Sequence, residues 1–128
     1  MGRELTAHRV NGCNDTLRVE VRDEPGPGGA PHEYAIVNAD PSSESFGPDE
    51  VIVALKFQNG PIKEAGVNGI THETLFAVLE DRLAGFQSGK FVCDENAAAL
   101  MHVRAAMAAL KRRTEARLAR GVEGTHTV

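Results

Sequence analysis

The sequence has few aromatic residues and few cysteines. Phe, Tyr and Trp make up 5% of its 128 residues, with one Tyr and no Trp. This leaves little surface on which the bases of an extended nucleic acid could stack. The two cysteines, Cys13 and Cys93, are far apart and provide neither a disulfide framework nor a four-cysteine zinc site. We therefore expect a protein of a reducing cytoplasm.

Long apolar runs are absent as well. No stretch reaches the roughly 18 consecutive apolar residues that indicate a membrane-spanning helix. The first six residues, Met1 to Thr6, have no apolar core of the kind found in a secretory signal. We expect a protein that has no membrane partner and is not secreted.

The charge is distributed unevenly along a chain whose net charge is −4. Residues 1–50 have four basic and ten acidic side chains, whereas residues 104–128 have six basic and two acidic ones. An anionic ligand is therefore expected at the C-terminal end. The net negative charge argues against nucleic acid as the partner.

We predict one α+β domain over residues 1–128, with a β-rich half at 1–70, a helical hairpin at 71–121 and a tail at 122–128. Its length fits a single domain. The second helix of the hairpin is expected to be long and to mediate self-association.

The β-rich half has three predicted strands. In residues 17–21, apolar side chains alternate with charged ones, the period of two of a half-buried strand. The second strand is 34–37, and the third, rich in β-branched residues, is 51–57. The Pro- and Gly-rich segment 23–30 is expected to form neither helix nor strand. The pattern predicts a small antiparallel sheet that contains a long-looped hairpin.

From Thr71 onward the apolar residues recur at helical spacing. We predict a first helix over 71–86, capped by Thr71. A second helix is expected from Asp94, whose carboxylate would cap it, to Arg120, with Gly121 as its end. Such a helix of about 26 residues is about 39 Å long, more than a compact monomer of this size accommodates easily.

Four apolar residues of this second helix repeat at intervals of three, four and three, the spacing of a coiled-coil seam. They are Leu100, Val103, Met107 and Leu110, and alanines fill the flanking positions. We predict that a second copy of the chain packs along this alanine-rich seam. The alternative is a frayed, solvated helix end from Thr114 onward.

The patterns of enzymes and metal sites are missing. None of the five histidines stands three or four residues from another, so no metal site is predicted. The glycines Gly26, Gly28 and Gly29 precede a strand, whereas a dinucleotide-binding loop requires a helix there. No serine lies in a nucleophile elbow, and neither cysteine has an identifiable base. We predict no catalytic residue and no cofactor.

Basic residues gather near the end of the second helix. Lys111, Arg112 and Arg113 are consecutive, and Arg117 and Arg120 continue the group. One interpretation is a solvated cationic face that complements the C-terminal end of the helix. The other is recognition of phosphate, which the guanidinium group fits well.

Three stretches together carry a resemblance to a known family. They are residues 57–69, the hairpin with Phe86-Gln87-Ser88-Gly89 and Glu95-Asn96-Ala97, and the ending 120–125. The chain resembles the first-described phage Thoeris anti-defence sponges. Its helical hairpin is also similar to that of the anti-CBASS cyclic-dinucleotide sponges, and segment 23–30 fits the same family.

This resemblance implies a non-catalytic homodimer or hexamer that captures the cyclic ADP-ribose isomers made by an immune TIR enzyme in the cytoplasm of the host cell. It also implies, for some members, a separate site for cyclic oligonucleotides such as cyclic di- or trinucleotides. The implied pocket residues are Phe86, Asn96 and Arg113. From the basic group we expect Arg113 to bind the pyrophosphate, with Arg112 or Arg117 nearby. Related hairpins tend to carry acidic residues about where Arg104 and Ala105 stand here.

The spacing of these residues bears on the implied pocket. Arg113 is 17 residues beyond Asn96, about 25 Å along a helix, so one small nucleotide cannot contact both in one chain. Two antiparallel second helices would bring Arg113 of each chain level with the other chain's hairpin loop. Phe86 as a core residue and Asn96 as a plain helix cap remain alternatives. So do two other functions, an enzyme that degrades the messenger and a nucleic-acid or protein interaction module.

Overall fold

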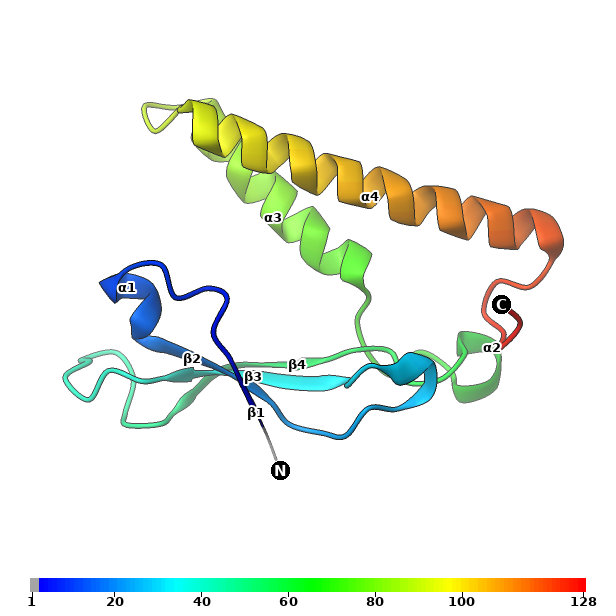
Figure 1. The fold of residues 1–128 in the computed structure, drawn as a ribbon, viewed down its shortest axis with the longest axis horizontal. Helices are drawn as coiled ribbons and strands as arrows, with labels where there is room; N and C mark the ends of the chain where they lie inside the picture. The colour runs from blue at the N-terminus through cyan, green and yellow to red at the C-terminus, as the bar shows by residue number, and fades with distance from the viewer. Residues whose placement is uncertain (1–2) are drawn as a thin grey trace. The chain divides into compact units, whose positions relative to one another are not determined.

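The computed structural model describes residues 3–128 (Figure 1). Its elements in order are β1 (Arg3–Leu5), α1 (Gly12–Asp15), β2 (Leu17–Val21), the 3-10 turn η1 (Pro27–Gly29), β3 (Glu33–Asn38), β4 (Val51–Lys56), α2 (Ile62–Ala65), α3 (His72–Gln87) and α4 (Asp94–Arg120). The predicted α+β class, a small antiparallel sheet followed by a helical hairpin, is confirmed.

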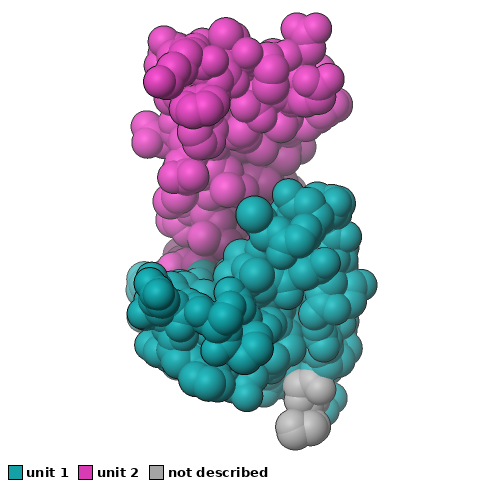
Figure 2. Space-filling model, turned by 90° about the vertical axis from the view of Figure 1, so that its left-hand side faces the viewer, with its two compact units in different colours: residues 1–60, 67–69 teal, residues 61–66, 70–128 magenta. Residues whose placement is uncertain are grey.

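The chain divides into two compact units, coloured separately in Figure 2. Unit 1 comprises Met1–Gly60 and Val67–Gly69, and unit 2 comprises Pro61–Gly66 and Ile70–Val128. The border of the units therefore falls close to the expected border at residue 70. The interpretation of residues 1–128 as one domain stays a prediction.

Unit 1 is built on a four-stranded antiparallel sheet of order β1-β2-β3-β4. All three predicted strands are present, and β1 is an additional edge strand. The register aligns Val19, Ile36 and Val53 across three strands on one face. Such cross-strand rows of β-branched side chains stabilise a sheet. The buried apolar core of this unit comprises Val21, Ala35 and Val37.

The segment between β2 and β3 contains a turn that the sequence analysis missed. Residues 23–30 were expected to hold no helix, but the 3-10 turn η1 lies within them. Gly28 and Gly29 both have φ of +84°, a conformation that glycine adopts without steric cost. Gly26 packs so closely on the ring of His32 that a Cβ would lie 2.6 Å from its Cε1 atom.

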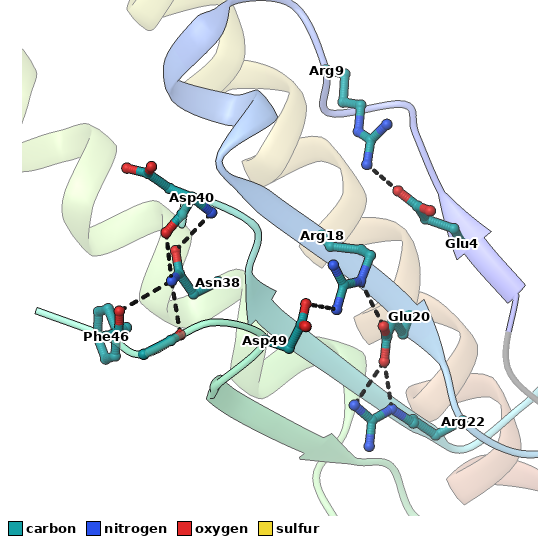
Figure 3. A network of polar contacts seen from close by, with 10 residues as sticks. Glu4, Arg9, Arg18, Glu20, Arg22, Asn38, Asp40, Phe46 and Asp49 are labelled. Carbon is teal, nitrogen blue, oxygen red and sulfur yellow. Dashed lines mark hydrogen bonds and ion pairs between the residues drawn. The ribbon is translucent and has the colours of Figure 1, made fainter. Parts of the chain in front are cut away.

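A polar network crosses the sheet and fixes the loop that follows β3 (Figure 3). The Arg18 guanidinium donates to Glu20 at 2.7 Å and to Asp49 at 2.9 Å. Arg22 donates to the same Glu20 carboxylate at 2.8 Å. Hydrogen bonds from Arg18 and then Arg22 lower the pKa of Glu20.

Buried Asn38 holds the loop that follows β3. Its side-chain amide nitrogen donates to three backbone carbonyls, those of Asp40, Phe46 and Gly47.

Unit 2 is the helical hairpin, and its helices begin and end close to the predicted positions. Thr71 caps α3, and Thr74 completes a reciprocal capping box. Gly121 ends α4 in the left-handed conformation with φ of +71°. The predicted cap of α4 is wrong by one residue, because Cys93 occupies the N-cap position and Asp94 is the first helical residue.

The predicted seam of α4 is already covered within a single chain. Leu100 is buried, and Val103, Met107 and Leu110 are half-buried. The two helices contact each other, and the Arg104 Nε atom pairs with the Glu80 carboxylate of α3 at 3.0 Å. The exposed side of α4 instead carries Ala97, Ala98, Met101, Ala105, Ala108 and Ala109. We call this set of exposed residues the alanine face.

The tail after α4 is anchored by one buried arginine. Arg117 is 8% exposed, and its guanidinium donates to the Glu123 carboxylate at 2.9 Å. It also donates to the carbonyls of Val122, Thr125 and Thr127 at 2.9, 3.1 and 2.6 Å. The alternative of a frayed helix end is therefore wrong, since α4 continues to Arg120 and the tail folds back on it.

The short helix α2 also holds the tail. The backbone N–H of Lys63 donates to the Gly124 carbonyl at 3.2 Å, and the Nδ1 atom of His126 lies 3.1 Å from the Glu64 carboxylate. Residues 61–66 are thereby joined to the helical hairpin rather than to the sheet. Among residues 3–128, no helix has both the length and the apolar composition needed to cross a membrane.

Candidate ligand site at the hairpin tip

The end of the hairpin where α3 meets α4 presents an aromatic pair. Phe86, in the last turn of α3, is 38% exposed. Its ring meets the ring of Phe91 edge to face, with centroids 6.1 Å apart and planes at 86°. The Arg82 guanidinium lies over the Phe86 ring, 5.5 Å from its centroid, within the range of a cation–π contact. Phe86 is thus a supported ring at the surface of this chain rather than a core residue.

Asn96 lies in the first turn of α4 and contacts the same loop. Its side-chain nitrogen Nδ2 donates to the Phe91 carbonyl oxygen at 3.4 Å, and its backbone N–H donates to Cys93 Sγ at 3.4 Å. Cys93 therefore makes the cap, so the Asn96 side chain is not used for capping. Phe91 contacts both Phe86 and Asn96, so the structure brings these two predicted residues together.

Hydrogen bonds hold the loop between the two helices at both of its ends. The Cys93 N–H donates to the Gln87 side-chain oxygen at 3.2 Å, and the Ser88 hydroxyl donates to the Gly85 carbonyl at 2.8 Å. Phe91 and Val92 are nevertheless exposed, by 63% and 57%. We call Phe86, the loop 88–93 and Asn96 together the hairpin tip; it is an ordered, partly apolar surface with polar groups at its edge.

The predicted arginines are not at the hairpin tip. Arg112 and Arg113 are exposed on α4, and within residues 3–128 neither guanidinium makes an ion pair or a side-chain hydrogen bond. Arg113 remains 17 residues from Asn96 on one continuous helix, about 25 Å. One chain therefore does not assemble Phe86, Asn96 and Arg113 around one nucleotide.

Arg117, the other expected phosphate ligand, has a different task. Its guanidinium already donates to one carboxylate and three carbonyls of the tail. Arginine has five N–H donors in a fixed planar arrangement, and the tail occupies most of them. In this structure Arg117 stabilises the fold and is not available to a phosphate group.

In the part of the chain that the structure describes, no group of three or more His, Cys, Asp or Glu side chains is placed to hold a metal ion. Cys13 and Cys93 are exposed free thiols, and they belong to different units.

Sequence reasoning missed Phe91. The signal was present as the apolar pair Phe91-Val92 inside a loop that is otherwise polar. Exposed apolar residues in a short interhelical loop are a reason to expect a contact with a ligand or a partner.

Comparison with known proteins agrees with this geometry. Residues 49–115 match the family model described as the Acb2/Tad1 hairpin domain. These residues contain β4, α3, the hairpin tip and most of α4. The protein is therefore of the class that carries this helical hairpin domain. The match covers more than half of the chain, which therefore belongs to the Acb2/Tad1 hairpin family, and the resemblance to the Thoeris anti-defence sponges is confirmed.

One relative is Thoeris anti-defense 1 from Bacillus phage SBSphiJ7. It is 44% identical over 75 residues, which make up 59% of this chain and 53% of the relative. The alignment thus spans about half of the relative's length.

Proposed function

We propose that this protein is a phage anti-defence protein that binds and sequesters cyclic ADP-ribose-type signalling nucleotides without catalysis. The hairpin tip carries the proposal, because an exposed, supported aromatic ring stands beside a side-chain amide inside the family-matched residues. Adenine can stack on Phe86, a contact worth about 1–3 kcal/mol per base. Asn96 can donate to and accept from the base or the ribose hydroxyls.

The phosphates require a cation that the hairpin tip of the same chain does not supply. We propose that Arg113 of a second copy grips the pyrophosphate, with Arg112 nearby, in a homodimer of antiparallel α4 helices. The exposed alanine face of α4 fits such a partner, because small side chains let helix backbones approach closely. Two equivalent sites per dimer follow from the two-fold symmetry. Hexamers built from such dimers are part of the same proposal.

Sequestration needs tight binding and no reaction. A ligand of about 35 non-hydrogen atoms, at about 0.3 kcal/mol per atom, gives about 10 kcal/mol, which approaches nanomolar affinity. A protein made in quantity in the cytoplasm of an infected host cell then lowers the free messenger concentration and leaves the downstream effector inactive.

Recovery of the ligand tests this function. The protein is incubated with a panel of cyclic ADP-ribose isomers and cyclic di- and trinucleotides, then denatured, and the supernatant is analysed by chromatography. We expect at least one cyclic ADP-ribose isomer to be bound and released intact. A linearised product identifies an enzyme instead. Failure of every small nucleotide to bind, with salt-dependent DNA binding, identifies a nucleic-acid module.

A further inference from the structure

The side-chain amide of Asn96 is held in one orientation. A backbone carbonyl only accepts hydrogen bonds, so the amide nitrogen must face the Phe91 carbonyl, 3.4 Å away. Turning the amide over would bring the Asn96 Oδ1 atom against the Phe91 oxygen, which places two acceptors together. The Oδ1 atom has no hydrogen-bond partner among residues 3–128, so it is the group left for a ligand, together with the second amide N–H.

An amide of fixed orientation distinguishes purine bases. On its Watson–Crick edge, adenine presents a donor, its 6-amino group, beside an acceptor, N1, and a side-chain amide matches this pair with two hydrogen bonds. Hypoxanthine presents the reverse pair, an acceptor oxygen at the 6-position beside the N1–H donor, so an amide in the same orientation would face acceptor with acceptor and donor with donor. In a free asparagine a turn of the amide relieves this conflict, but here the Phe91 carbonyl opposes that turn.

We propose that the Phe91 carbonyl, acting through Asn96, makes the hairpin tip selective for 6-amino purines over 6-oxo purines. This inference rests on the proposed function, since it concerns the base of the bound nucleotide. Phe91 is a positioning residue in this scheme. Its main chain sets selectivity between bases, whereas its ring supports the stacking surface of Phe86 for any base.

The primary test needs no variant. Calorimetry with the full chain compares a cyclic ADP-ribose isomer whose riboses are joined to each other, which leaves the 6-amino group free, with its deaminated hypoxanthine counterpart. We expect the hypoxanthine ligand to bind roughly 5- to 150-fold more weakly, the discrimination typical of one good two-bond contact to a base. Equal affinities overturn the inference and leave the proposed function intact. If the adenine ligand does not bind either, the proposed function fails first.

Two variants separate the main chain from the ring. Phe91→Leu keeps the carbonyl and removes the aromatic contact, so both ligands should weaken by the same factor and their affinity ratio should stay at the wild-type value. Asn96→Ala removes the discriminating amide, so the ratio should approach one; circular dichroism checks that its helices remain. The assignment is overturned if Phe91→Leu no longer prefers the adenine ligand over the hypoxanthine ligand. It is also overturned if a folded Asn96→Ala keeps the wild-type ratio of the two affinities.

Discussion

At the scale of single residues, the arginines of α4 differ by environment rather than by type. Arg112 and Arg113 are exposed, whereas Arg117 is buried and surrounded by oxygen atoms of the tail. A buried charge is tolerated only where hydrogen bonds and an opposite charge compensate it. Arg117 meets that condition through Glu123, so we assign it to stability, whereas ligand binding by the exposed pair is part of the proposed function.

We expect Arg117→Ala to destabilise the protein by about 1.5–3 kcal/mol, because the Glu123 carboxylate and three tail carbonyls lose a charged donor. Urea unfolding measures the free energy, and digestion by carboxypeptidase shows whether residues 122–128 are released. The matched control is Arg112→Ala, exposed on the same helix, which should change stability by less than about 0.5 kcal/mol. Equal effects of the two substitutions contradict the assignment.

The loop between β2 and β3 depends on one carboxylate. Asp23 accepts the backbone N–H of Glu33 at 2.9 Å and that of His32 at 3.0 Å, and these bonds hold the pKa of Asp23 below its ordinary value. Between the lowered folded pKa and the ordinary unfolded value of about 4, the unfolded chain binds more protons. Stability from Asp23 is therefore fully present above pH 4 and is lost as the pH falls through the folded pKa.

In Asp23→Asn this acid dependence should shrink. Urea unfolding of both proteins at a series of pH values from neutral to about 3 measures it. We expect the variant to be less stable than the wild type at neutral pH, because the side chain no longer carries a charge to the two N–H groups, and the difference should narrow in acid. If the free energies of unfolding of the wild type and the variant differ by the same amount at every pH, Asp23 makes no pH-dependent contribution to stability.

At the scale of elements, α4 begins with an unusual cap. The Cys93 thiol accepts the Asn96 N–H at 3.4 Å, and sulfur is a weak acceptor, whereas serine is among the preferred N-cap residues. Cys93→Ser should therefore stabilise the protein by about 0.5–1 kcal/mol in thermal or urea unfolding. Cys13→Ser, at an exposed thiol in α1, is the control and should change little. A loss of stability in Cys93→Ser contradicts the role of the cap.

The long elements could be predicted because their signals are local. Thr71 and Gly121 mark helix ends by side-chain capping and by a left-handed backbone, and the alternation of apolar and charged residues marks the strand β2. The elements β1, α1 and α2 have three or four residues each, too few to show a period. Their positions depend on contacts with distant residues, as between α2 and the tail.

Only part of the candidate site could be predicted, because some of its contacts depend on how the chain folds and not on local patterns. The family resemblance placed Phe86 and Asn96. The apolar pair Phe91-Val92 indicated an exposed contact in the loop, but a local pattern does not say which residues Phe91 contacts. The charge pattern placed arginines on the end of α4 without distinguishing Arg113 from Arg117. That distinction comes from the tail, which folds back on the helix and accepts hydrogen bonds from the Arg117 guanidinium.

At the scale of the whole molecule, the proposed site depends on the number of chains. The rise of α4 separates Asn96 from Arg113 by about 25 Å, and nothing within unit 2 shortens that distance. In the proposed homodimer, a second chain in antiparallel orientation supplies the missing cation. We therefore expect Arg113→Ala to abolish messenger binding in calorimetry while light scattering shows the oligomer unchanged. Loss of assembly, or unaltered affinity, contradicts this role.

Mixing two inactive variants tests whether the site is shared. Phe86→Ala and Arg113→Ala should each fail to bind the messenger alone. When the two are unfolded and refolded together, each mixed dimer has one site with an intact hairpin tip from one chain and Arg113 from the other, so binding should return. The control mixes Phe86→Ala with Asn96→Ala, whose defects both lie at the hairpin tip, so every site stays incomplete. Binding restored in neither mixture shows that each chain carries its own site, and binding restored in both contradicts the pairing of one chain's hairpin tip with the other chain's Arg113.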